Sequence, residues 1–324
     1  MQVSVACMGT MTFGWDPDDW GSTKEESLRV AQSALEIGIN FFDCADVYAR
    51  GVSETILGEA LRGKRDKIVL ATKCHGKMAD DDPNAWGNSR KHVIEACEAS
   101  LRRLGTDWID LYQIHRPQPS VPIDETIRGL EDLIRAGKVR YAGTSTFAAW
   151  QLCEAHYVAR SLGASGFVCE QPPYNLLDRR IERELLPFCR TYDWGVIPWS
   201  PLAGGQLSGK YLDGKASGAR YASSDPMNRV NAQSMTAVRK LKKIADREGL
   251  TLAQLSLAWV AGQPGVTSPI IGAKSEKQLK ESADACQIKL SHRALQAIDK
   301  VVLPGGNVLN YYSAEFGPNA RPWC

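Results

Sequence analysis

The chain has 324 residues, of which 44% are apolar, and its 39 basic and 37 acidic residues leave a formal net charge of +2. This near balance argues against a nucleic-acid partner or an anionic membrane surface, because both require clustered Lys and Arg. The sequence has no apolar run of 18 residues and no basic, apolar leader, so we expect neither a membrane span nor a signal peptide.

The nine cysteines are scattered, odd in number and never spaced as CxxC. A chain of this length can build its own core without a disulfide framework, so we predict free thiols in a reducing, cytoplasmic compartment. The five histidines form no HxH or HExxH pair, and we therefore expect no metal site.

Short apolar runs alternate with longer stretches of helical period along the chain. The runs predict strands at 3–8, 40–42, 67–72, 109–114, 139–144, 166–170, 195–199 and 268–271. The amphipathic stretches predict helices at 23–37, 53–61, 90–104, 123–136, 147–162, 182–192, 235–262 and 275–283. Within 90–104, for example, Val93, Cys97, Leu101 and Leu104 recur at helical spacing between charged residues.

Buried strands joined by helices indicate a parallel sheet, and eight such units favour closure into a barrel. The sequence thus predicts an α/β protein, a (β/α)8 TIM barrel that forms one domain over residues 1–324. No break in composition indicates a linker. The polar stretch 202–228, rich in Gly and Ser, is long enough to form a mobile lid.

Ionisable side chains fall where three of the predicted strands end. The second strand runs into Asp43 and then Tyr48, the third ends at Lys73, and the fourth ends at His115. Active sites of such barrels lie at the carboxyl ends of the strands, so these four side chains should converge at the barrel mouth. Their neighbours Cys44 and Cys74 should point away as small apolar fillers.

An acid, a phenol, an amine and an imidazole in one site suit the reduction of a carbonyl group. A free tyrosine has a pKa of about 10 and is a slow acid at neutral pH. A nearby Lys73 ammonium would stabilise the phenolate and lower that pKa, while Asp43 would hold the lysine in place. His115 would orient the carbonyl oxygen, and Tyr48 would deliver the proton.

Each residue also has an ordinary structural explanation. Asp43 could cap a helix, Tyr48 could be a half-buried loop residue, and His115 could be a satisfied core histidine. A strand-end lysine such as Lys73 is harder to explain in this way, because buried lysines are rare without a partner. The coincidence of all four at strand ends favours a catalytic group.

Eight stretches of the chain, in order from residue 9 to about 283, make it resemble the aldo-keto reductase superfamily. They are GTMTFG (9–14), NFFDCADVY (40–48), ATK (71–73), DLYQIHRP (110–117), GKVRYAGTSTF (137–147), QPPYNLL (171–177), WSPLAGGQLSGKY (199–211) and IIGAKSEKQLKE (270–281). The resemblance implies the barrel fold and a catalytic tetrad of Asp43, Tyr48, Lys73 and His115.

The same resemblance implies an NADP(H) site. Ser145 and Gln171 would hold the nicotinamide carboxamide, and Trp199 would stack on the ring. The pyrophosphate would lie along a second set, Ser200, Leu202, Gly204, Lys210 and Arg220. The adenosine end would contact a third set, Lys274, Ser275, Gln278 and Glu281. A helix N-terminus beside Lys274 favours a 2′-phosphate, and therefore NADP(H) over NAD(H).

Two positions depart from the commonest family pattern. Thr146 stands where Asn is usual, and Trp199 replaces a Tyr, as in the branch that includes potassium-channel β subunits and bacterial sugar-aldehyde reductases. The expected reaction is NADPH-dependent reduction of a small aldehyde or ketone. The alternative is a nucleotide-sensing subunit of the channel type, with slow or no turnover. The sequence predicts no oligomeric state and no particular substrate.

Overall fold

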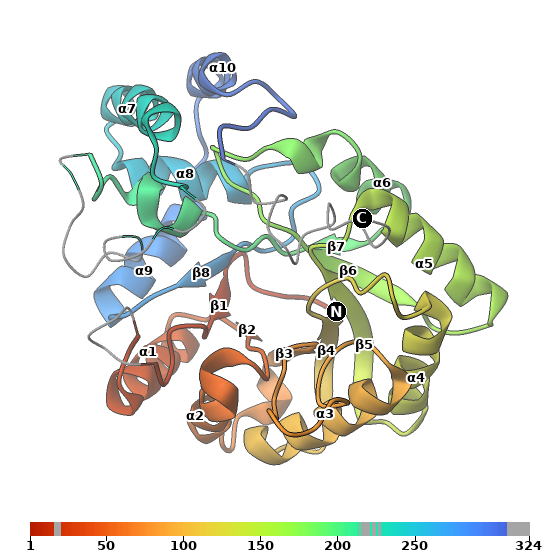
Figure 1. Ribbon diagram of the computed structural model, residues 1–324. Coiled ribbons are helices and arrows are strands. Elements are labelled where there is room, and N and C mark those ends of the chain that lie inside the picture. The colour runs from red at the N-terminus through yellow and green to blue at the C-terminus, as the bar shows by residue number, and fades with distance from the viewer. Residues whose placement is uncertain (16–20, 213, 215–220, 222–224, 226–227, 310–324) are drawn as a thin grey trace.

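Eight parallel strands form one curved sheet in the computed structural model, which describes residues 1–15, 21–212, 214, 221, 225 and 228–309 (Figure 1). The hydrogen-bonded order is β7-β6-β5-β4-β3-β2-β1-β8. Two further bonds join its ends: Thr267 N donates to Val196 O at 2.7 Å, and Ile270 N donates to Pro198 O at 2.8 Å. The chain is therefore a (β/α)8 barrel, as the sequence predicts.

The strands are β1 (Cys7–Gly9), β2 (Phe41–Asp43), β3 (Val69–Cys74), β4 (Ile109–Ile114), β5 (Val139–Ser145), β6 (Phe167–Gln171), β7 (Gly195–Val196) and β8 (Ile270–Gly272). Around them lie α1 (Lys24–Glu36), α2 (Val52–Ala60), α3 (Arg90–Leu104), α4 (Ile123–Arg135), α5 (Ala149–Ser161), α6 (Leu185–Thr191), α7 (Ala232–Arg247), α8 (Leu252–Ala261), α9 (Glu276–Ala285) and α10 (His292–Val301) (Figure 1). Among the described residues, no helix combines the length and the apolar character needed to cross a membrane.

The predicted helix at 235–262 is wrong, because two helices occupy this stretch. The first, α7, ends at Arg247, and Gly249 follows with a left-handed φ of +69° that a helix interior excludes. Thr251 then accepts a hydrogen bond from Gln254 N and begins α8. Helix α10 was not predicted. The first strand begins at Cys7 rather than residue 3, since Ser4 N donates to the Asn40 side chain instead of a strand.

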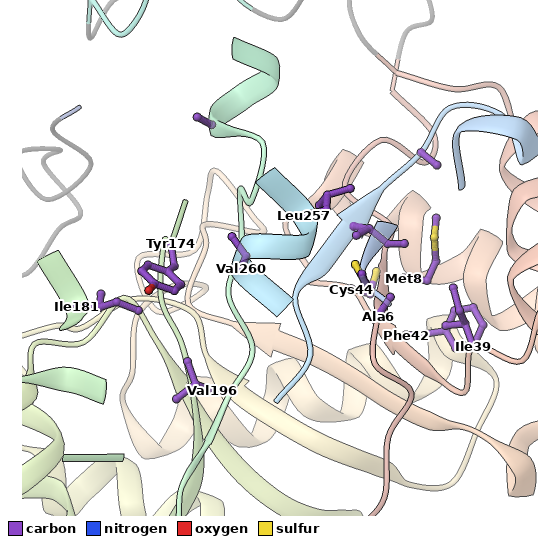
Figure 2. Packing of buried hydrophobic residues seen from close by; sticks show 14 of the residues in the cluster. Ala6, Met8, Ile39, Phe42, Cys44, Tyr174, Ile181, Val196, Leu257 and Val260 are labelled. Carbon is purple, nitrogen blue, oxygen red and sulfur yellow. The ribbon is translucent and has the colours of Figure 1, made fainter. Parts of the chain in front are cut away.

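Side chains on the strands alternate between the barrel interior and the helix layer. Cys7, Phe41, Val69 and Leu111 belong to a small interior cluster, and Val3 from the N-terminal segment packs against it. The neighbouring positions face the helices and join a larger cluster. Figure 2 shows Met8, Phe42 and Cys44 gathered in that outer layer. Cys44 and Cys74 are buried free thiols of this layer, as predicted.

A buried ion pair connects α2 and α3. The Glu54 carboxylate is fully buried, and it accepts hydrogen bonds from Arg103 Nε at 2.7 Å and from Thr72 Oγ1 at 2.5 Å. Removing one partner of such a pair leaves an uncompensated charge inside the protein, which costs more than the loss of a surface pair.

We expect Arg103→Met to lower the free energy of unfolding by about 2–4 kcal/mol, since it strands the Glu54 carboxylate. Urea denaturation followed by circular dichroism measures this change. Arg102→Met is the matched control, because Arg102 is an exposed neighbour on α3 and should shift stability by about 0.5 kcal/mol or less. Equal effects of the two substitutions would contradict a stabilising role for the buried pair.

Candidate active site

A polar layer closes the top of the barrel interior directly above the apolar cluster. Phe41, Ala71, Leu111 and Cys169 all belong to that cluster, on β2, β3, β4 and β6. The residues two positions later are Asp43, Lys73, Gln113 and Gln171, which share the same inward face because strand side chains alternate with a period of two. All four are buried, with at most 2% of their surface exposed.

These four side chains are bonded to one another. Lys73 Nζ donates to Asp43 Oδ2 at 2.6 Å and to the carbonyl oxygen of Cys44 at 2.6 Å. Asp43 Oδ1 accepts from Gln171 Nε2 at 2.8 Å and from Gln113 Nε2 at 3.3 Å. The buried charges are thus paired and hydrogen-bonded, which is the condition for keeping an ion pair out of water.

The Tyr48 hydroxyl lies next to this layer and accepts a hydrogen bond from Lys73 Nζ at 3.3 Å. The tyrosine begins a short 3₁₀ turn, Tyr48–Gly51, that follows β2. Ala49 and Arg50 in that turn have left-handed φ values of 47° and 51°, which cost free energy in residues that carry a Cβ. The surrounding contacts therefore impose a strained backbone that presents Tyr48 to the site.

Two opposing effects set the pKa of Tyr48. Burial raises it, and the Lys73 charge and hydrogen bond lower it; burial is the larger effect, so the pKa lies above its ordinary value. The lowering predicted from Lys73 is present but does not prevail. Burial also lowers the pKa of Lys73, but the nearby Asp43 carboxylate and Tyr48 outweigh it and raise that pKa above its usual range. Tyr48 is therefore protonated and Lys73 charged at neutral pH.

His115 follows β4 and faces Tyr48. The two ring centroids are 5.9 Å apart, with the planes at 79°. Burial and the neighbouring Arg116 and Lys73 charges hold the pKa of His115 well below its ordinary value, so the imidazole is neutral at pH 7. Its ring can then donate one hydrogen bond without carrying a charge. The structure thus brings together all four predicted catalytic side chains.

A cavity of about 490 Å³ opens beside Tyr48 and His115. This volume is within the range of small-molecule and cofactor sites, about 300–1,000 Å³. Eight of the predicted cofactor residues border it, namely Gln171, Trp199, Ser200, Leu202, Gly204, Lys210, Lys274 and Gln278. Ser145, Ser275 and Glu281 are not among its lining residues, and Arg220 lies outside the described part of the chain.

The loop after β7 turns its backbone along one wall of the cavity. Ser200, Ala203, Gly204 and Gly205 all have left-handed φ values, between 50° and 94°. The Ser200 hydroxyl accepts a hydrogen bond from Gly204 N at 3.1 Å. A Cβ on Gly204 would lie 2.4 Å from the Tyr221 hydroxyl, so this turn requires glycine. Turns that combine such conformations can point backbone N–H groups at an anion.

At the start of α9, two predicted cofactor residues form hydrogen bonds with backbone groups of the protein itself. Ser275 caps the helix by accepting a hydrogen bond from Gln278 N, and the Gln278 side chain accepts from Lys274 N at 2.9 Å. Glu281 is exposed and lies 3.9 Å from Lys277. Of the predicted set at this end, Lys274 and Gln278 border the cavity, whereas Ser275 orders the turn that presents them.

The two residues predicted to hold the nicotinamide carboxamide also form hydrogen bonds within the protein. Ser145 is fully buried, and its hydroxyl donates to the carbonyl oxygen of Gln171 at 2.9 Å. The Gln171 side chain donates to Asp43. Both residues therefore support the polar layer, and Gln171 alone of the two also reaches the cavity.

The sequence prediction missed several residues of the site, among them Gln113, Arg116 and Arg229. Gln113 could have been found from strand alternation, because it stands two positions after Leu111, as Lys73 stands two after Ala71. Arg116 follows His115 directly and borders the cavity, but the sequence does not show the loop geometry that brings it there. Arg229 borders the cavity from a segment far along the chain, and no motif indicates it.

The chain is similar over most of its length to proteins of one known family. The aldo/keto reductase family model matches residues 6–303. A putative voltage-gated potassium channel subunit beta of Schizosaccharomyces pombe is 37% identical over 306 residues, which cover 91% of this chain and 88% of that protein. An uncharacterized oxidoreductase of Bacillus subtilis is 37% identical over 97% of each chain. The versiconal hemiacetal acetate reductase of Aspergillus parasiticus is 32% identical over 94% of each.

The family model spans most of the chain, the relatives are similar over nearly their whole length, and the fold is the barrel described above. The chain therefore belongs to the aldo/keto reductase family of oxidoreductases.

Proposed function

We propose that this protein reduces an aldehyde or ketone to an alcohol with NADPH, and that Tyr48 is the proton donor. One observation carries the proposal: Lys73 Nζ lies 2.6 Å from the Asp43 carboxylate and 3.3 Å from the Tyr48 hydroxyl, beside a cavity that reaches both Tyr48 and His115. We further propose that residues 1–324 form one catalytic domain.

The residues around the cavity suit a dinucleotide that carries phosphates. Lys210, Arg229 and Lys274 border it on the side of the β7 loop and α9, where their charges would pair with phosphate oxygens. Trp199 also borders the cavity and offers it an aromatic ring. When bound there, a reduced nicotinamide cofactor supplies the hydride that carbonyl reduction requires.

Tyr48, Lys73 and His115 would divide the proton chemistry. As hydride reaches the carbonyl carbon, the electron pair of the C=O bond moves to oxygen, which takes the Tyr48 proton. The Lys73 ammonium stabilises the phenolate that remains, and Asp43 keeps Lys73 in place. The neutral His115 ring donates a hydrogen bond to the carbonyl oxygen and orients it. Positioned proton transfer of this kind is worth about 10²–10⁴-fold in rate.

A nucleotide-sensing role is the second candidate, because similar proteins carry the name of potassium channel subunit beta. A sensor would bind NADPH with slow or no turnover, whereas a reductase would oxidise NADPH repeatedly. Steady-state NADPH oxidation against a panel of aldehydes and ketones separates the two functions. Tight NADPH binding without turnover on any carbonyl would favour the sensor, whereas Tyr48-dependent oxidation supports the reductase.

We expect Tyr48→Phe to lower kcat for carbonyl reduction by about 10²–10⁴-fold, because it removes the donated proton. The affinity for NADPH should stay nearly unchanged, since the ring remains in place. Stopped-flow absorbance and fluorescence titration measure the two quantities. Tyr141→Phe is the matched control, because Tyr141 is 42% exposed on β5 and should keep full activity. Retention of most activity in Tyr48→Phe would remove Tyr48 from its assigned role.

We also expect Lys274→Ala to weaken NADPH binding by about 10-fold or more and NADH binding far less, because the lost charge would face the 2′-phosphate. Equilibrium titration of both nucleotides measures the difference. Lys277→Ala, one helical turn on and 86% exposed, serves as the control and should change neither affinity. Equal losses for the two nucleotides in Lys274→Ala would count against a 2′-phosphate contact.

A further inference from the structure

Glu170 is a buried carboxyl on β6 that the proposed proton transfer does not use. Its neighbours in the strand, Cys169 and Gln171, belong to the apolar cluster and to the polar layer of the barrel interior. Because strand side chains alternate, Glu170 points to the opposite face, toward the helix layer. It is fully buried there. A carboxyl is rarely buried to this degree without partners that replace water, so its contacts indicate what it does.

The Glu170 carboxyl spans the turn that joins β5 to α5. Thr144 Oγ1 donates to Oε2 at 2.5 Å on the strand side, and Phe147 N donates to Oε1 at 3.2 Å on the helix side. Between these two donors lies Thr146, whose φ of 63° is left-handed and costs free energy in a residue that carries a Cβ. The carboxyl therefore holds a strained turn from both of its ends.

The same turn contacts two residues that border the cavity. Ser145 Oγ donates to the Gln171 carbonyl oxygen at 2.9 Å, and Thr146 N donates to the same oxygen at 3.1 Å. Arg116 Nη1 donates to Thr146 Oγ1 at 3.0 Å. Gln171 and Arg116 both line the cavity, whereas Glu170 does not. Glu170 is thus one step removed from the site, because a shift of the turn would move both lining residues.

The charge state of this carboxyl depends on burial and on the donors of the turn. Burial raises the pKa of Glu170 to about 8, and the hydroxyl and backbone N–H donors lower it by smaller amounts. Both charge states have hydrogen-bond partners. An ionised carboxyl accepts from Thr144, and a protonated one can donate to the same hydroxyl, which then donates to the Cys169 carbonyl oxygen at 3.3 Å. Glu170 is therefore mainly protonated at neutral pH and ionises as the pH rises past about 8.

The charge of Arg116, from the loop after β4, interacts with Glu170. Burial lowers the pKa of the Arg116 guanidinium to about 10, and Glu170 acts to raise it. The thiols of Cys169 on β6 and Cys189 on α6 also interact with Glu170, but burial raises their pKa values and keeps them neutral. The contacts from β5 and the start of α5 are a hydroxyl and a backbone N–H, and β7 beside it is Gly195–Val196. Ionisation of Glu170 therefore acts mainly on the turn and on Arg116.

Arg116 connects this change to the proton donor. Burial is the largest effect on the pKa of Tyr48, but the charge of Arg116 acts to lower it, because a nearby cation stabilises the phenolate. A neutral Glu170 does not oppose this effect, whereas an ionised Glu170 offsets part of it. The phenolate that forms when Tyr48 gives up its proton is then stabilised less. Carbonyl reduction should therefore be faster while Glu170 is protonated.

We propose that Glu170 is a positioning residue of the reductase, which holds the turn between β5 and α5 and whose proton adjusts how strongly Arg116 supports proton release from Tyr48. This inference rests on the proposed reductase function. Glu170 does not reach the reacting atoms and acts through the turn and through Arg116. The site thus responds to pH at a carboxyl outside the catalytic group.

Two substitutions separate the hold on the turn from the charge. Glu170→Gln keeps the size and the hydrogen bonds but is never charged, so its single-turnover rate of NADPH oxidation at pH 7 should stay near the wild-type rate. Glu170→Ala releases Thr144 Oγ1 and Phe147 N, and we expect it to lower this rate by about 10-fold, the effect of one or two lost hydrogen bonds. Circular dichroism checks that both variants fold. A wild-type rate in a folded Glu170→Ala would overturn the hold on the turn.

The pH profile of the same rate tests the role of the proton. We expect the wild-type rate to fall by at least about 2-fold as the pH rises, in a step with its midpoint near 8, and the step to be absent in Glu170→Gln. Glu154→Gln, at an exposed glutamate on α5, is the matched control and should keep the step. The absence of a step in the wild-type protein, or a step that survives in Glu170→Gln, would overturn this role. Tyr48-dependent reduction in the same assay would leave the proposed function standing.

A second measurement does not depend on turnover. With ¹⁵N-labelled arginine, the Nε resonance of Arg116 can be assigned from its loss in Arg116→Lys and followed from pH 6 to 9. We expect its chemical shift to change with a midpoint near pH 8 in the wild-type protein and to stay constant in Glu170→Gln. Identical behaviour of the two proteins would contradict the link between Glu170 and Arg116, whether or not any carbonyl is reduced.

Discussion

The buried ion pair between Lys73 and Asp43 is the interaction on which the rest of the site depends. Both side chains are buried, so each charge is stabilised by the other charge and by the surrounding hydrogen bonds in place of water. Gln113 and Gln171 satisfy the second carboxylate oxygen, and the Cys44 carbonyl satisfies the ammonium. Tyr48 completes the set, because its hydroxyl accepts from the same ammonium. A change in any one of these groups would alter the charge that the others experience.

The barrel supplies this arrangement through strand alternation. Apolar residues at Phe41, Ala71 and Leu111 fill the interior, and the next inward positions carry the polar layer. The apolar cluster beneath keeps water out, which makes the electrostatic contacts above it stronger than they would be in solvent. The same burial raises the pKa of Tyr48, so the phenol is protonated at neutral pH. The two-residue alternation of strand side chains therefore places both the apolar interior and the polar layer above it.

Much of this could be predicted from the sequence, because the relevant signals are local. The eight strands follow from apolar runs, and Asp43, Lys73 and His115 follow from the ends of those runs. Other features depend on three-dimensional context. The break between α7 and α8 depends on the left-handed conformation of Gly249. The apolar pattern continues across the break, so the sequence does not reveal it. The membership of Arg116 and Arg229 in the cavity depends on how loops return over the barrel mouth. The pKa of Tyr48 depends on how deeply the hydroxyl is buried, and no sequence motif gives that depth.

The charge state of Lys73 tests whether the buried ion pair with Asp43 organises the site. With ¹⁵N-labelled lysine, the Nζ resonance of Lys73 can be assigned from its loss in Lys73→Met and followed as the pH rises, in the wild-type protein and in Asp43→Asn. We expect Lys73 to stay an ammonium throughout pH 6–10 in the wild-type protein, because Asp43 and Tyr48 outweigh the effect of burial on its pKa. In Asp43→Asn, where burial is less opposed, its pKa should fall measurably. Loss of the Lys73 proton near neutral pH in the wild-type protein, or identical titration in both proteins, would contradict a site organised by the pairing of Lys73 with Asp43.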